Sequence, residues 1–265
     1  MLKKPPRVLI TKKRRDMIGI VGGVGPLAGL DILTKIIEET QAQSDQDHLP
    51  VHLFSQPQKV AETAAYGIKQ TGKNPAYAIV EIIQELERIG ATSVAIPYHD
   101  AHAPLIFNVI LEELKNKNSR VTILNMIKET VKFVKDQYAG LTKIGVLSAN
   151  CARNGDLYAG FMEENNLTAI IPNAELQKSI DASVYNETYG IKTISSPVSN
   201  RARQELLTFI MQLKKDGAQA VILGGVEFTL AVPDKESAGI PNIDPYRVLA
   251  RALISATSPE KLRPL

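Results

Sequence analysis

Residues 89–102 read IGATSVAIPYHDAH, and the rest of the chain is organised around this stretch. Its glycine follows an amphipathic segment and precedes a short apolar run, which is the pattern of a helix end, a tight turn and a buried strand. The run leads into the polar residues Tyr98, His99 and Asp100. In an open α/β sheet, ligands bind at the carboxyl ends of the strands. The stretch therefore predicts a parallel sheet and the place of its functional loop.

The same pattern recurs at residues 216–227, which read DGAQAVILGGVE. Laying Gly90 on Gly217 places Tyr98 on Gly225, at an offset of 127 residues (225 − 98). A strand-and-loop unit that recurs at a fixed offset is typical of two related halves. We therefore expect Tyr98 and Gly225 to face each other across a cleft.

A second pair of apolar runs, residues 18–21 and 144–147, aligns at an offset of 126 residues (144 − 18). Apolar runs alternate with helical periodicity along the chain, which favours parallel sheets covered by helices. We expect two tandem, pseudo-symmetric, Rossmann-like α/β domains with parallel sheets and an interdomain cleft. The expected first domain comprises residues 17–116 and 229–265, and the second comprises residues 117–228.

The composition is that of an ordinary globular protein, with 265 residues of which 44% are hydrophobic and 22% are charged. No apolar run approaches the roughly 18–20 residues of a membrane span, so no membrane partner is expected. The basic N-terminal extension, residues 1–16, has seven Lys or Arg residues and one acid. The rest of the chain then has a net charge of −3 (+3 less +6), which does not favour nucleic-acid binding. The single cysteine, Cys151, fits a reducing compartment and predicts a cytoplasmic location.

Three motifs resemble those of the cofactor-independent aspartate/glutamate racemase family, and most closely those of its aspartate racemases. That family has GGMGP after its first strand, CNTAH after a mid-chain strand and GCTE after a late strand. This chain has GGVGP at residues 22–26, YHDAH at residues 98–102 and GGVE at residues 224–227. The resemblance covers nearly all of residues 17–255. It implies an amino-acid racemase fold, no cofactor, a small amino acid or carboxylate as ligand, and a homodimer.

Both positions that hold the family's catalytic cysteines differ in this chain, where they are Tyr98 and Gly225. In the family, one thiol removes the α-proton and the other delivers a proton to the opposite face; a thiol with a pKa of about 8.5 suits both roles. A phenol with a pKa of about 10 is a poor base at neutral pH, and glycine has no acid or base. We therefore expect a family member that has lost two-thiol racemisation and keeps a binding or regulatory role. Cys151 is a further candidate acid or nucleophile, but one thiol does not complete a two-base mechanism.

The resemblance also implies a set of substrate-binding positions, which are Val24, Gln56, His99, Asp100, Asn150, Lys192 and Val226. Lys192 retains a lysine that contacts substrate in the family. Glu62 replaces the arginine that binds a substrate carboxylate there. Because an anion repels a carboxylate, we expect a monocarboxylate or a neutral-tailed amino acid to bind in preference to aspartate.

Two alternative functions follow from the same residues. The first is an active racemase, isomerase or lyase that uses non-cysteine groups such as His99, Asp100, Lys192 or Cys151. The second is a metal-dependent hydrolase whose ion is bound by His99 and His102, with Glu227 approaching from the opposite loop. The short H-x-x-H loop has no third ligand fixed by the sequence, so we expect no metal.

Overall fold

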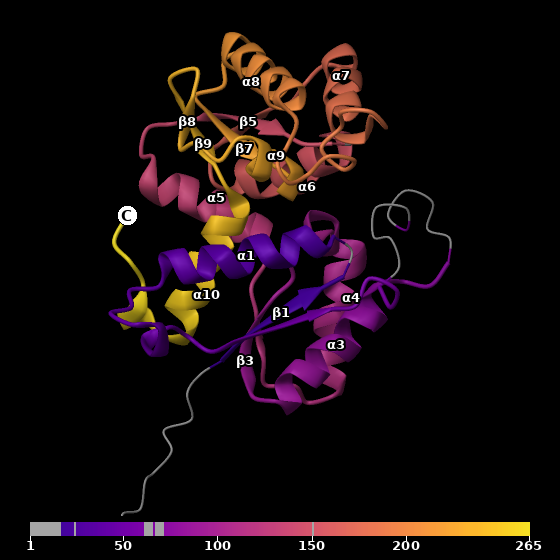
Figure 1. The fold of residues 1–265 in the computed structure, drawn as a ribbon, viewed down its shortest axis with the longest axis vertical. Coiled ribbons are helices and arrows are strands. Elements are labelled where there is room, and N and C mark those ends of the chain that lie inside the picture. The colour runs from indigo at the N-terminus through magenta and orange to yellow at the C-terminus, as the bar shows by residue number, and fades with distance from the viewer. Residues whose placement is uncertain (1–16, 24, 61–65, 67–71, 150) are drawn as a thin grey trace, which may run out of the picture.

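A computed structural model describes residues 17–23, 25–60, 66, 72–149 and 151–265, without the side chains of residues 151–156. The described strands form two sheets (Figure 1). The first sheet has the order β2-β1-β3-β4 with parallel pairing, and it consists of β1 (Met17–Gly22), β2 (Val51–Ser55), β3 (Ala91–Ala95) and β4 (Thr122–Ile123). The second has the order β6-β5-β7-β9-β8, and it consists of β5 (Lys143–Leu147), β6 (Thr168–Ile170), β7 (Ala220–Leu223), β8 (Glu236–Ser237) and β9 (Ile240–Ile243). Its strands pair in parallel except β8 with β9, which pair antiparallel. The expected α/β fold with parallel sheets is confirmed.

Helices cover both sheets. Those nearest the first sheet are α1 (Pro26–Glu39), α3 (Ala76–Arg88), α4 (Pro104–Asn116) and α10 (Pro245–Thr257). The others are α5 (Met126–Gln137), α6 (Cys151–Glu164), α7 (Ala174–Tyr185), α8 (Asn200–Lys215) and α9 (Val226–Ala231). Three short 3-10 helices are η1 (Asp45–Asp47), η2 (His99–His102) and η3 (Pro259–Lys261). Figure 1 shows the second sheet above the first, with α1 lying across the middle of the molecule.

β7 divides the core of the second sheet into two layers. Val221 and Leu223 belong to the cluster formed with α7 and α8, whereas Ala220 and Ile222 belong to the cluster formed with α5 and α6. Successive side chains of a strand point to opposite faces, so an unbroken apolar run is expected where both faces are covered. This alternation explains why residues 220–223 contain no polar side chain.

The two sheets repeat one close contact at equivalent glycines. A Cβ built on Gly19 of β1 would lie 3.0 Å from the Val94 side chain, and a Cβ on Gly145 of β5 would lie 3.0 Å from the Val221 side chain. These pairs lie at the two offsets found in the sequence. Glycine at both positions therefore lets neighbouring strands and their side chains pack without overlap.

Adding a methyl group at either glycine should destabilise the protein. We expect Gly19→Ala and Gly145→Ala each to lower the free energy of unfolding by about 1–3 kcal/mol, because extra atoms in a packed core force their neighbours to move. Gly160→Ala in α6 is the matched control, since no atom lies within 4 Å of its added Cβ, and it should be stabilising by about 0.4–1 kcal/mol. Urea unfolding of the three variants measures these changes. Equal stability of all three would contradict the expected packing.

The sheets differ from the predicted halves in two places. β4 pairs with β3 of the first sheet, although residues 117–228 are the expected second domain. β9 pairs with β7 of the second sheet, although residues 229–265 are the expected end of the first domain. α10 then enters the core around the first sheet through Leu249 and Leu253. Runs of two to four residues have too little periodicity to indicate which sheet edge they extend, and the domain boundaries themselves stay a prediction.

The inner face of α1 also differs from its sequence prediction. The periodicity of residues 27–42 predicts Leu30, Leu33, Ile36 and Ile37 on one side. Ile36 is buried, but Leu30 and Ile37 are exposed, and Lys35 is buried in their place. Lys35 lies in the interior because it pairs there with two carboxylates, those of Asp31 in the same helix and Asp244 at the start of α10. The helix sequence contains only the first of these two partners.

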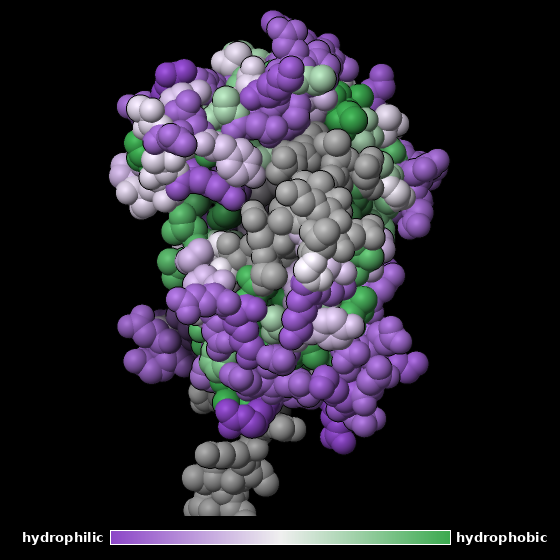
Figure 2. All heavy atoms as spheres, turned by 90° about the vertical axis from the view of Figure 1, so that its right-hand side faces the viewer, coloured by the Kyte–Doolittle hydropathy of each residue, from purple (hydrophilic) through white to green (hydrophobic). Residues whose placement is uncertain are grey.

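Among the described residues, no helix has the length and apolarity needed to cross a bilayer. Figure 2 shows hydrophilic side chains over much of one face, with hydrophobic atoms in smaller areas between them.

Candidate functional site

A cavity of about 600 Å³ opens between the two sheets. Loops at the carboxyl ends of β1, β3, β5 and β7 line it, which is where an α/β sheet places its ligand site. The segment after β3 contributes Tyr98, His99 and Asp100, and the segment after β7 contributes Gly225 and residues 226–228 from the start of α9. The two positions that the repeat predicts to face each other therefore line one cavity.

The two loops begin with the same backbone turn. The Tyr98 N–H donates a hydrogen bond to the Ile96 carbonyl at 2.9 Å, and the Gly225 N–H donates to the Leu223 carbonyl at 2.9 Å. Tyr98 and Gly225 thus occupy equivalent places, although one carries a phenol and the other no side chain. The cavity is asymmetric in its chemistry, despite the repeated backbone.

The Glu227 carboxylate fills the space beside Gly225. A Cβ built on Gly225 would lie 2.9 Å from Oε2 of Glu227 and 3.2 Å from the Phe228 ring. Oε1 of the same carboxylate lies 3.7 Å from Nζ of Lys192, and this ammonium also lies 5.0 Å from the centre of the Tyr185 ring. An anion and a cation therefore lie together on the wall of the cavity beside Gly225.

Two buried histidines, His99 and His102, begin and end η2 in the segment that follows β3. Nε2 of His99 lies 3.1 Å from the Tyr158 hydroxyl, and Nε2 of His102 donates to the Ile96 carbonyl at 2.9 Å. Burial lowers the pKa of His99 to about 3, with a further lowering by His102, and burial lowers the pKa of His102 to about 4. Both rings are therefore neutral at neutral pH, so neither is a ready general acid there.

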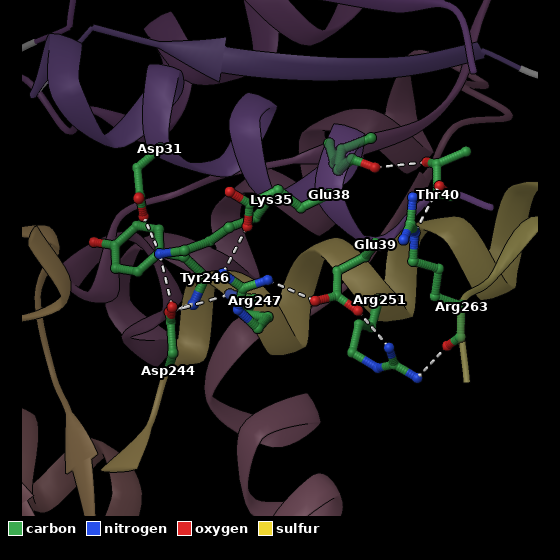
Figure 3. A network of polar contacts seen from close by, with 11 residues as sticks. Asp31, Lys35, Glu38, Glu39, Thr40, Asp244, Tyr246, Arg247, Arg251 and Arg263 are labelled. Atoms are coloured by element: carbon green, nitrogen blue, oxygen red, sulfur yellow. Dashed lines mark hydrogen bonds and ion pairs between the residues drawn. The ribbon is translucent and has the colours of Figure 1, made fainter. Parts of the chain in front are cut away.

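Tyr246, from the first turn of α10, forms another part of the wall. Its helix is capped by Asp244, whose carboxylate accepts hydrogen bonds from the Tyr246 and Arg247 N–H groups. The same carboxylate pairs with Lys35 of α1 at 2.7 Å, and Lys35 also pairs with Asp31 (Figure 3). Burial raises the pKa of Tyr246, and the Glu227 carboxylate raises it further, so the phenol stays protonated.

This polar network continues away from the cavity and joins α1 to α10. Glu39 accepts hydrogen bonds from Arg247 and Arg251, and Arg247 also pairs with Glu38 at 2.7 Å (Figure 3). Burial opposes ionisation of Glu39, but the two guanidinium groups outweigh it and hold the pKa of this carboxyl below its usual value. The network holds the first turn of α10 against α1, and so fixes the backbone of Tyr246 at the wall of the cavity.

The cavity contains most of the residues chosen from the sequence. Those that line it are Tyr98, His99, Asp100, Lys192, Gly225 and Val226. Gln56 is not among the lining residues, although its neighbour Pro57 is. Val24, Asn150 and Glu62 lie outside the described residues.

Cys151 differs from its predicted place. The sequence places it in a loop, but it is the first residue of α6, a helix whose apolar periodicity begins only further along. Its side chain lies outside the described residues, so its role as an acid or nucleophile stays a prediction.

The described residues give no support to a metal site. No three His, Cys, Asp or Glu residues among them come close enough together to bind one ion. The ring nitrogens that hydrogen-bond in His99 and His102 contact protein groups, as described above.

Sequence reasoning missed Tyr246 and Tyr185 as parts of the cavity. Tyr185 lies at the end of α7, and Tyr246 lies in a helix that follows the last strand of the second sheet. The Asp-Pro pair that begins α10 indicates a helix start. Nothing in that pattern indicates which cavity the helix would line.

Comparisons with known proteins agree on one family. A family model described as Asp/Glu/Hydantoin racemase matches residues 21–253. The chain is 24% identical over 243 residues to a broad specificity amino-acid racemase of Bacillus subtilis (strain 168), a match that spans 90% of this chain and 97% of that protein.

Solved structures agree with this match. The aspartate racemase of Picrophilus torridus superposes with a TM-score of 0.72 at 26% identity, over 91% of this chain and 94% of that chain. An aspartate racemase homologue from Pyrococcus horikoshii OT3 superposes with a TM-score of 0.71 at 20% identity, over 92% and 99% of the two chains, and shows a shared fold.

Proposed function

The chain belongs to the Asp/Glu/hydantoin racemase family, and from this premise we propose that its cavity binds a small amino acid or carboxylate while two-thiol racemisation has been lost. The observation that carries the proposal is the pair Tyr98 and Gly225 in one cavity. Racemisation without a cofactor needs a proton-transfer group on each face of the α-carbon. Gly225 provides none, and a phenol is a poor base at neutral pH.

The charges around the cavity support a ligand with a single carboxylate. Among the described lining residues, Lys192 is the one Lys or Arg, whereas Asp100 and Glu227 are both acidic. His99 is neutral at neutral pH because burial lowers its pKa. A ligand with two carboxylates would therefore enter a site that has one cation and two anions. Its second carboxylate would have no lysine or arginine among these residues to pair with.

Aspartate should bind at least about tenfold more weakly than alanine or 2-aminobutyrate, because an unpaired carboxylate near other anions loses more than about 1.4 kcal/mol. Calorimetric titration of the three amino acids against the full chain measures this difference. Tighter binding of aspartate than of both neutral amino acids would contradict the proposal and show that Glu62 does not replace the family's arginine in the cavity.

A homodimer and a cytoplasmic location are further parts of this proposal. They follow from the resemblance and from the single cysteine, respectively. Light scattering of the purified full chain tests the dimer, which predicts twice the 29.0 kDa of one chain.

A further inference from the structure

A second cavity, of about 590 Å³, lies between the cores of the two sheets. Residues of α4, β4, α5 and α6 line it, and we call it the α4–α6 cavity. Among the described residues none lines both cavities, but η2 contributes His99 to the first and His102 to the second. The volume is within the roughly 300–1,000 Å³ that is usual for small-molecule sites. The α4–α6 cavity is therefore large enough for a ligand of its own.

The walls of the α4–α6 cavity are mainly apolar and include two aromatic rings. Gly160 of α6 leaves space beside it, because no atom lies within 4 Å of a Cβ built there. The apolar side chains that line the cavity are those of Phe107, Leu111, Ile123, Leu124, Leu157 and Phe161. A flat ring packs well against aromatic side chains, in stacked or edge-to-face contact. This lining therefore favours an aromatic ligand.

The charges at the α4–α6 cavity favour a neutral ligand. Of the described lining residues, Lys128 is basic, whereas Glu129 and Glu164 are acidic. Lys128 and Glu164 are exposed, so water and salt screen them. An anion would meet two like charges and a cation would meet one, with little compensation from the screened partners.

His102 provides a buried polar atom at this cavity, and its side chain is 3% exposed. Nε2 donates to the Ile96 carbonyl, which can only accept, so the neutral ring has its proton on Nε2 and a lone pair on Nδ1. Nδ1 is buried and has no hydrogen-bond partner among the described residues. A buried acceptor without a donor is unfavourable, so a ligand that brings a donor to Nδ1 gains affinity.

We propose that the α4–α6 cavity binds a small, neutral aromatic molecule whose N–H or O–H group donates a hydrogen bond to Nδ1 of His102. The Phe107 ring, whose centre lies 5.3 Å from that of His102, moves aside so that the donor reaches Nδ1. This site is separate from the first cavity. It does not depend on the amino-acid or carboxylate ligand proposed there.

Two isomers, 3-methylindole and 1-methylindole, test the hydrogen bond, because they have the same size and only the first has an N–H donor. We expect the full chain to bind 3-methylindole at least about tenfold more tightly than 1-methylindole at neutral pH. The chain contains no tryptophan, so the fluorescence of the bound indole ring measures both affinities without a background from protein indoles.

Four variants test the place of binding and the role of His102. Gly160→Leu puts a side chain into the α4–α6 cavity and should weaken 3-methylindole binding at least about tenfold. Ala159→Leu is the matched control, because it adds the same side chain at an exposed position of α6 outside the cavity lining. Gly25→Leu puts it into the first cavity instead, and neither of these two variants should change the affinity. His102→Phe should reduce the difference between the isomers to less than about threefold.

Several outcomes would overturn this inference. They are equal affinities of the isomers for the wild type, an undiminished difference between them in His102→Phe, and an unchanged affinity in Gly160→Leu. A loss of 3-methylindole binding in Gly25→Leu would place the ligand in the first cavity and overturn it as well. Absence of 3-methylindole binding up to about 1 mM would have the same consequence.

Light scattering adds a check on a different occupant. A wild-type dimer that Gly160→Leu converts to a monomer would assign the α4–α6 cavity to a contact between two copies of the chain and overturn the inference. Circular dichroism of each variant confirms that it is folded before titration. The amino-acid titrations described above test the first cavity separately, so failure of either proposal leaves the other in place.

Discussion

The wild-type protein should exchange the α-proton of D- or L-aspartate at least about 1,000-fold more slowly than the Picrophilus torridus aspartate racemase assayed beside it. Loss of one positioned acid or base slows proton transfer by about 10²–10⁴-fold, and both loop positions are altered here. Glutamate should behave in the same way. NMR detection of α-deuteration in deuterated water measures the rate for each enantiomer. Rapid exchange of either enantiomer would show that other groups had replaced the thiols.

Restoring both cysteines should not restore the reaction. Tyr98→Cys/Gly225→Cys returns both cysteines of the family, but Glu62 still stands at the position where the resemblance implies a carboxylate-binding arginine. An anion at that position repels the second carboxylate of aspartate. Adding Glu62→Arg to the double variant should therefore raise the rate of α-deuteration of aspartate above that of the double variant. A double variant as fast as the triple variant would contradict this role of Glu62.

Acidification should destabilise the fold strongly between pH 6.5 and pH 4.5. The pKa of His99 is lowered to about 3 and that of His102 to about 4, whereas an unfolded histidine has its ordinary value of 6.5. The unfolded chain therefore binds more protons than the folded chain below pH 6.5, so stability is complete above this pH and is lost as the pH falls. Two such groups lower the free energy of unfolding by up to about 2.7 kcal/mol for each pH unit, or on the order of 5 kcal/mol between pH 6.5 and pH 4.5.

Urea unfolding at several pH values measures the slope of the free energy of unfolding against pH. The variants His99→Gln and His102→Gln show how much of this slope each histidine causes. Each variant removes one titrating ring, so each should reduce the slope by about half. Their stability at pH 7.5 gives the separate effect of lost packing, which does not vary with pH. A slope that is unchanged in both variants would show that other groups cause the acid sensitivity. The window lies above the range in which Glu39, whose pKa is lowered by its arginine partners, loses its charge.

The amino-acid sequence by itself determined the class of the fold and two loops that line one cavity. The repeated Gly-Ala turn followed by an apolar run identifies β3 and β7, because a short buried strand needs apolar residues on both faces. The offset of 127 residues, within one residue of that between the other pair of strands, then pairs Tyr98 with Gly225, and both line one cavity. Lys192, His99 and Asp100, which the family resemblance implies as substrate-binding positions, also line that cavity. The strands and the repeat depend on local patterns, which a linear sequence contains in full.

Only the tertiary structure decided how the side chains of the site are arranged. Glu227 fills the space beside Gly225, and Tyr246 comes from a helix that returns from the second sheet to the first core. Lys35 is buried because its own helix provides Asp31 and the start of α10 brings Asp244 to it. The contacts of Asp244 and Tyr246 join segments far apart in the chain, and contact energies depend on burial and on the distance between charges. Neither quantity is contained in residue spacing, so the pKa values, the ion pairs and the shape of the cavity follow from the packed fold alone.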